Sequence, residues 1–122
     1  MILRDIVALI PNTSLQDADL DIEIPCACAA DLMSDVLAFA EPGSLLLTSL
    51  CNPQVVRTAQ VADISAVIFV HGKMPSDPML TLARELSIPL FSTPYPMFEV
   101  CGRLHAAGVR AGIVVPTEQR RV

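Results

Sequence analysis

The fold of this chain is decided by residues 65–72, which read Ser-Ala-Val-Ile-Phe-Val-His-Gly. The five residues from Ala66 to Val70 are all apolar, with no polar residue alternating between them. Continuous apolar runs are typical of parallel strands, because helices cover both faces of the sheet. A histidine and a glycine follow directly, at the end of the strand where sheets of this kind bind ligands.

Three further apolar segments have the length and composition of strands, over residues 22–29, 45–50 and 88–91. Around them, apolar residues recur at the spacing of amphipathic helices. The helices expected from this spacing cover residues 3–10, 31–40, 52–63, 75–86 and 94–105. Residues 12–21 are polar and acidic and are expected to form a loop.

The alternation of strands and helices predicts an α/β fold. Short connections between successive elements favour right-handed crossover helices. We therefore predict a compact three-layer α/β/α domain with about four mainly parallel strands. This domain is expected over residues 1–108, followed by a C-terminal extension over residues 109–122. Within the extension, Ile113-Val114-Val115 is expected to add an edge strand, and residues 117–122 a polar tail.

The composition of the chain excludes several classes of protein. Of its 122 residues, 52% are hydrophobic and 17% are charged, which excludes disorder as the main state. A net charge of −5 offers no positive surface to nucleic acid or to an anionic membrane, so we expect neither as a partner. No export signal is recognised in the sequence, so the four cysteines are expected to be reduced thiols of a cytoplasmic protein.

Three segments resemble one known family. Residues 31–37, Asp-Leu-Met-Ser-Asp-Val-Leu, are similar to the Asp-Leu-Leu-Ser-Asp-Val-Met helix of DRTGG-domain proteins. Residues 92–94, Ser-Thr-Pro, and 98–105, Phe-Glu-Val-Cys-Gly-Arg-Leu-His, are similar to the closing Ser-Thr-Pro and Phe-Glu-Val-Ala-Gly-Arg-Leu-Tyr of that family. Residues 65–72 resemble its strand and glycine turn. The resemblance covers residues 1–108 and implies a domain like the N-terminal half of HPr kinase/phosphorylase.

The resemblance implies a regulatory or dimerisation module and no catalytic activity, since family members occur beside CBS domain pairs and in regulatory inserts of pyrophosphatases. The sequence departs from the family where the eponymous Thr-Gly-Gly would stand, because residues 25–27 read Pro-Cys-Ala. Glycines there would allow the backbone to approach a ligand closely, and these residues do not. Residues 50–52, Leu-Cys-Asn, likewise replace the Gln-Thr-His of the family and remove an imidazole.

Polar residues follow each predicted strand, and together they form the candidate ligand site. In parallel sheets the carboxyl ends of the strands share one edge, so we expect these residues to lie along it. The candidate ligand-binding residues are Asp31, Ser34, Asp35, Asn52, His71, Gly72, Ser92 and Thr93.

Each part of this site also has a purely structural interpretation. Asp31 and Asp35 at a helix N-terminus could contact a ligand or cation, or could serve as a helix cap and a solvated face. His71 could contact a phosphate or carbonyl group, or could bond to a neighbouring loop. Residues 92–94 at the start of the last helix could hold an anion or cap the helix.

The cysteines suggest a second hypothesis, a thiol-based metal-binding or redox protein that uses Cys26, Cys28 and Cys51. Zinc sites usually need four ligands with a looped Cys-x₂₋₄-Cys spacing, which an extended Cys-x-Cys does not match. Structural burial is therefore favoured, and no metal is expected. Cys101 and His105 lie four residues apart, but they fall on the apolar stripe of a helix, which favours packing over a catalytic dyad.

We predict from these observations a non-catalytic regulatory or dimerisation module. It is expected to sense a small anionic metabolite or nucleotide at the carboxyl ends of the strands, without a cofactor. The low charge leaves apolar surface exposed, so a homodimer or a partner protein subunit is expected. No phosphate-binding lysine motif is present, and a small enzyme built around Asp31, His71 and Ser92 ranks last because no nucleophile and base are paired.

Overall fold

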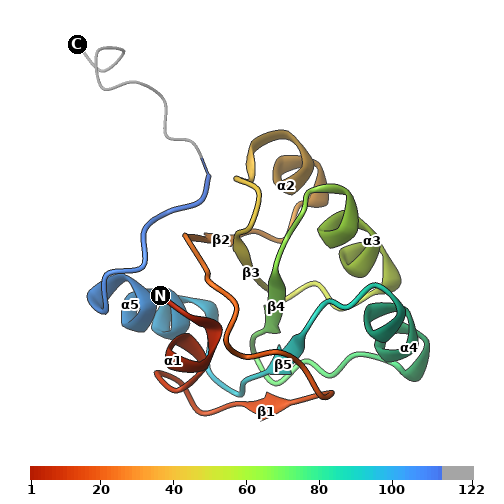
Figure 1. The fold of residues 1–122 in the computed structure, drawn as a ribbon, viewed down its shortest axis with the longest axis horizontal. Helices are drawn as coiled ribbons and strands as arrows, with labels where there is room; N and C mark the ends of the chain where they lie inside the picture. Colours follow the sequence, from red (N-terminus) through yellow and green to blue (C-terminus); the bar gives the residue numbers. More distant parts are fainter. Residues whose placement is uncertain (114–122) are drawn as a thin grey trace.

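A five-stranded sheet forms the centre of the protein, as described by a computed structural model of residues 1–113 (Figure 1). The spatial order of the strands is β1-β5-β4-β3-β2. Strands β2 to β5 are parallel neighbours, and β1 is antiparallel to β5. The strands are β1 (Thr13–Ser14), β2 (Ala27–Ala29), β3 (Leu45–Thr48), β4 (Ala66–Phe69) and β5 (Leu90–Ser92).

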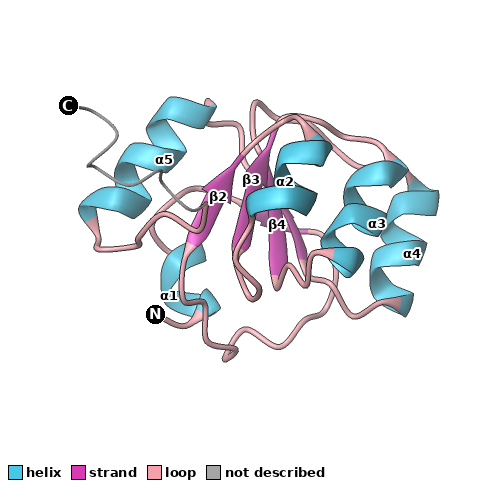
Figure 2. Ribbon diagram, turned by 90° about the horizontal axis from the view of Figure 1, so that it is seen from above, coloured by secondary structure: helices cyan, strands magenta, loops and turns pink. Residues whose placement is uncertain are grey.

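Helices cover both faces of this sheet (Figure 2). One face carries α2 (Met33–Phe39), α3 (Pro53–Val61) and α4 (Asp77–Glu85), the three crossover helices. The other face carries α1 (Leu3–Val7) and α5 (Met97–Ala106). The crossover helices share a face because the strands that they join are added in one direction across the sheet. No helix of residues 1–113 is long and apolar enough to span a bilayer.

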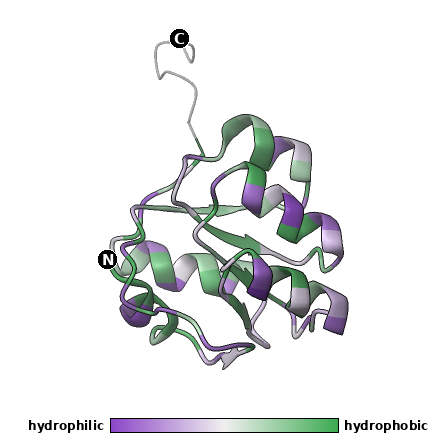
Figure 3. Ribbon diagram, turned by 45° about the vertical axis from the view of Figure 1, so that its right-hand side comes forward, coloured by the Kyte–Doolittle hydropathy of each residue, from purple (hydrophilic) through white to green (hydrophobic). Residues whose placement is uncertain are grey.

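Alternate residues of the central strands supply two separate cores. Leu45 and Leu47 of β3 pack with α1 and α5, whereas Leu46 packs with α2, α3 and α4. Every residue of β3 and β4 is buried, as expected for strands covered on both faces. In Figure 3 the central strands are green, while the helices carry both green and purple residues. The apolar runs of the sequence therefore reflect a sheet with no exposed face at its centre.

The structure confirms the predicted α/β class, the three layers and the parallel strands, and corrects several elements. The antiparallel strand β1 lies within the segment predicted as a loop. Strand β2 is confined to Ala27–Ala29, far shorter than predicted. On the helix that carries the predicted apolar stripe, the side chain of Phe98 is 90% exposed.

The end of the described chain returns to the β2 edge of the sheet. Ala111 forms a parallel bridge with Ala27, and Ile113 an antiparallel bridge with Ala40. The predicted edge strand over residues 113–115 is described only at Ile113, and residues 114–122 lie outside the described part of the chain. The division between a domain and an extension at residue 108 stays a prediction.

Candidate functional site

The carboxyl ends of β4 and β5 meet where the chain leaves the sheet in opposite directions. After β4 it continues to α4 on one face, and after β5 to α5 on the other. Ligands of α/β sheets bind at such a divergence, and we call the surface between the two connections the crevice. Three backbone hydrogen bonds join the two connections: His71 N–H to Tyr95 O at 2.9 Å, Gly72 N–H to Thr93 O at 2.8 Å, and Thr93 N–H to Phe69 O at 2.9 Å.

His71 and Gly72 form a turn that holds the histidine at the surface of this crevice. His71 has φ +58° and Gly72 has φ +69°, both in the left-handed region. This conformation suits glycine and is uncommon for histidine. Both residues are exposed, and no atom lies within 4 Å of the position that a Gly72 side chain would take. The turn therefore presents an imidazole beside open space.

The hydroxyl groups of Ser92 and Thr93 are engaged within the protein. Ser92 Oγ donates a hydrogen bond to Lys73 O at 2.7 Å, and Thr93 Oγ1 accepts one from Tyr95 N–H at 3.2 Å. Both residues are buried. Helix α5 begins only at Met97, with Pro96 as its N-cap. Residues 92–94 therefore do not form the N-terminus of α5, and a ligand role of Ser92 and Thr93 stays a prediction.

Asp31 joins the end of β2 to the end of β3. Its Oδ1 accepts hydrogen bonds from Thr48 Oγ1 at 2.9 Å and from Ser49 N–H at 2.7 Å, and its Oδ2 accepts one from Ser49 Oγ at 2.6 Å. The Ser49 hydroxyl is the largest cause of a lowered pKa at this carboxyl group. The predicted cap of α2 is wrong, since Leu32 takes that position.

Two further candidates lie on the first turn of α2. Ser34 and Asp35 are both exposed there, next to the loop that carries Asp31. The Asp31 carboxylate points to the end of β3 and bonds there, so the three residues do not form one ligand cluster. A ligand role for Ser34 and Asp35 stays a prediction.

Asn52 is the N-cap residue of α3, as predicted, although its side chain makes no capping hydrogen bond. Its Oδ1 atom is buried and has no hydrogen-bond partner within the described residues. The residue follows β3, next to the β4 end that carries His71, because Thr48 and Phe69 are register partners. An amide oxygen thus lies without a partner beside the same crevice.

Lys73 is a residue that the sequence analysis missed. It is the single lysine of the sequence and follows His71-Gly72 directly. Its charge lowers the pKa of the Cys51 thiol, although burial of the thiol has the larger effect and raises that pKa. It takes part in none of the four ion pairs found among the described residues. Its position after the strand was the signal that could have identified it.

The cysteines do not form a metal centre within residues 1–113, where no group of three potential ligands comes together. Cys26 and Cys28 are buried, and Cys51 and Cys101 are half-buried. Burial raises the pKa of all four thiols, and that of Cys28 to about 11. Metal ligands and nucleophiles are thiolates, and these thiols remain protonated near neutral pH.

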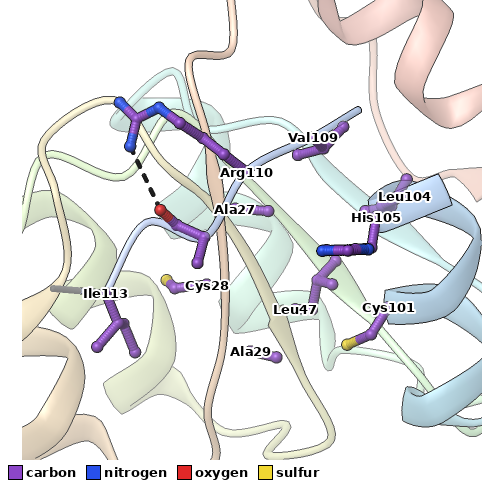
Figure 4. A pocket seen from close by; sticks show the side chains of 11 residues that line it. Ala27, Cys28, Ala29, Leu47, Cys101, Leu104, His105, Val109, Arg110 and Ile113 are labelled. Atoms are coloured by element: carbon purple, nitrogen blue, oxygen red, sulfur yellow. Dashed lines mark hydrogen bonds between the residues drawn. The ribbon is translucent and has the colours of Figure 1, made fainter. Parts of the chain in front are cut away.

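A cavity of about 290 Å³ opens at the opposite edge of the sheet, beside β2 (Figure 4). Helix α5 forms one wall, and residues 109–113 form another. The predicted ligand residues lie elsewhere. The residues that line it are Ala27, Cys28, Ala29, Leu47, Cys101, Leu104, His105, Val109, Arg110, Ala111 and Ile113.

The comparisons with known proteins identify the fold. No protein-family model and no curated protein matches this chain by sequence. Among solved structures, the chain is similar to the CBS and DRTGG domains of the regulatory region of Clostridium perfringens pyrophosphatase, complexed with the activator diadenosine tetraphosphate. The TM-score is 0.71 at 17% identity, over 96% of this chain and 51% of that one. The match confirms the predicted resemblance at the level of the fold, and this chain spans about half the length of the matched chain.

Proposed function

We propose that this protein is a regulatory module that binds a small anion, of the nucleotide or acyl-phosphate class, at the carboxyl ends of β4 and β5. The single observation that carries the proposal is Lys73, a cation outside the described ion pairs, beside the crevice at which the chain diverges. The likeness of the fold to a regulatory region solved with a nucleotide activator supports the same class of ligand.

The carboxyl ends of β4 and β5, which we call the rim, have side chains that favour binding of an anion over a cation. The Lys73 ammonium group supplies charge, and the exposed His71 and the space over Gly72 leave room for a phosphate group. The Asp31 carboxylate, at the same end of the sheet, already accepts three hydrogen bonds. An anion beside Lys73 gains charge-assisted hydrogen bonds.

We also propose that the module associates with a second copy of itself through α2 and α3. These helices pack against each other on the outer face of the crossover layer. Leu37 and Phe39 of α2 are 51% and 52% exposed, and Val61 at the end of α3 is 74% exposed. Large exposed apolar side chains are typical of interfaces, because association removes them from water.

Titration calorimetry with ATP, AMP and inorganic phosphate tests the anion site. In the Lys73→Gln variant we expect affinity to fall about tenfold or more, as when one charge-assisted contact of 1.5–3 kcal/mol is lost. The matched control is Arg57→Gln, which removes another exposed positive charge from α3, outside the crevice. Equal affinities in Lys73→Gln and the wild type, or no binding of any of the three anions, would reject this site.

Light scattering on the full chain tests the association. We expect a dimer that the double change Leu37→Ser and Phe39→Ser converts to a monomer with unchanged circular dichroism. Phe98→Ser serves as the control, because it removes an exposed phenyl ring from α5 on the other layer. A wild-type monomer at millimolar concentration would reject the interface while leaving the anion site to be judged by calorimetry.

A further inference from the structure

The cavity at the β2 edge lies between the small side chains of β2 and helix α5, because these side chains are too short to fill the space between them and the helix. Half-buried Ala27 and exposed Ala29 of β2 line it together with Leu47 of the neighbouring β3. Helix α5 contributes Cys101, Leu104 and His105 to its side. Larger residues in β2 would fill the space, as the leucines of β3 fill the core next to it. The sequence of β2, Ala-Cys-Ala, thus leaves a volume between sheet and helix.

The outer wall of the cavity is held in place by specific contacts. Ala27 N–H donates to Arg110 O at 3.0 Å, and Gly112 N–H donates to Ala27 O at 2.7 Å. Arg110 Nη2 also pairs with Glu41 Oε2 at 2.6 Å. These bonds tie residues 110–112 to both the sheet edge and the loop after α2.

Gly112 allows this wall to lie so close to the sheet. A Cβ atom at this position would be 2.6 Å from Ser44 Oγ and 2.9 Å from Cys26 Sγ. Contacts under 3.0 Å require the neighbours to move, and both of these neighbours are buried. Residues 110–112 therefore form a tightly packed wall of the cavity. A side chain at residue 112 would push that wall outward.

Apart from the imidazole of His105, the described lining of the cavity carries no free ionisable group. The Arg110 guanidinium group is neutralised by Glu41, and the thiols of Cys28 and Cys101 are protonated because burial raises their pKa. A charged ligand would lose hydration here without gaining a partner, which is costly. The exposed imidazole of His105 faces the cavity in Figure 4 and supplies one hydrogen-bonding group.

We propose that this cavity is a binding site for a small, uncharged, ring-shaped apolar molecule that makes one hydrogen bond to His105. Its size follows from the volume, since an apolar cavity of 150 Å³ holds a benzene molecule. A volume of about 290 Å³ thus accommodates a bicyclic ring with roughly ten non-hydrogen atoms. This ligand differs in charge from the anion proposed for the rim, so the two sites are independent.

Indole is the probe that tests this proposal, because it is bicyclic, uncharged and carries one N–H group. We expect saturable binding by calorimetry on the full chain, with a rise in melting temperature as indole is added. In the Ala29→Leu variant, which fills the cavity from the side of β2, we expect the affinity to fall at least tenfold. The matched control is Ala38→Leu, which adds the same atoms at an exposed position of α2.

A second filling variant, Cys101→Met, narrows the cavity from the side of α5 and keeps the test valid if Ala29→Leu fails to fold. The Lys73→Gln variant should bind indole with wild-type affinity, since Lys73 does not line the cavity. Absence of saturation up to the solubility limit of indole would overturn the proposal. Unchanged affinity in a folded filling variant would do the same, whatever the anion titrations show.

Discussion

The rim at the ends of β4 and β5 and the edge formed by β2 lie on one sheet and are built in opposite ways. At the rim, polar side chains follow the strands, and two of the predicted site hydroxyl groups bond within the protein. At the edge, alanines and a close backbone crossing leave a cavity lined mostly by apolar side chains. Hydroxyl groups after a strand can thus be used up by bonds within the protein, whereas a lack of side-chain volume leaves a cavity.

The largest effect is expected at the edge, from Gly112→Ala. The added methyl group collides with Ser44 and Cys26, so we expect the free energy of unfolding to fall by about 2–3 kcal/mol. Urea denaturation measures this change, and hydrogen exchange at the Ala27 amide should become faster because its bond to Arg110 O is lost.

Gly102→Ala is the matched control for this substitution. Gly102 lies inside α5, and no atom lies within 4 Å of its Cβ position. Alanine should therefore stabilise the helix by about 0.5–1 kcal/mol. If Gly112→Ala proves as stable as the wild type, the wall at the β2 edge is not held as the structure describes.

At the carboxyl ends of β2 and β3, the largest effect is expected from Asp31→Ala, which removes three hydrogen-bond acceptor contacts that join β2 to β3. The residue is exposed, so we expect a loss of about 1–2 kcal/mol in the free energy of unfolding. Asp35→Ala, four residues along on the exposed face of α2, should change stability by less than about 0.5 kcal/mol.

We also expect Asp31 to make the free energy of unfolding depend on pH. Hydrogen bonds from Ser49 hold the folded pKa of Asp31 below its ordinary value of 3.8, so the unfolded chain binds the proton first as the pH falls. The stabilisation is complete above this ordinary value and is lost as the pH falls through the folded pKa. Denaturation curves between pH 6 and pH 2 should converge for the wild type and Asp31→Ala. A difference in stability that stays constant down to pH 2 would show that the contribution of Asp31 does not depend on its ionisation.

The smallest effect is expected from His71→Gly at the rim. Glycine relieves the left-handed conformation at φ +58° but loses more entropy on folding, so we expect a net gain of about 0.5 kcal/mol. Ser87→Gly, at φ +57° after α4, should give a similar gain. Anion affinity separates the two, because only His71→Gly should weaken it. Equal anion affinity in both variants would remove His71 from the proposed site.

The sheet could be predicted from the sequence because its central strands are buried on both faces. Residues 65–70 and 45–50 contain an uninterrupted run of apolar residues, and both became strands in which every residue is buried. Strand β1 could not be predicted, since its two residues, Thr13 and Ser14, are exposed and polar. Its pairing with β5 depends on backbone hydrogen bonds, which leave no pattern in the side chains.

The sequence predicted where the candidate residues lie in the sheet, but only part of the contacts that they make. Placing residues after strands located His71 correctly, because the topology fixes where parallel strands end. Other features depend on contacts between distant segments. Examples are the hydrogen bonds of Asp31 to residues 48–49 and the hydrogen bond from Gly112 N–H to Ala27 O. No local spacing records such contacts, so the cavity beside β2 was not foreseen.

The most direct test of two independent sites is one set of amide nuclear magnetic resonance spectra, recorded while AMP and then indole are added to the full chain. We predict that AMP shifts the amide signals of His71, Gly72 and Lys73, and that indole shifts those of Ala29, His105 and Ala111. Overlapping sets of shifted amides, or no saturable shift with either compound, would contradict the account.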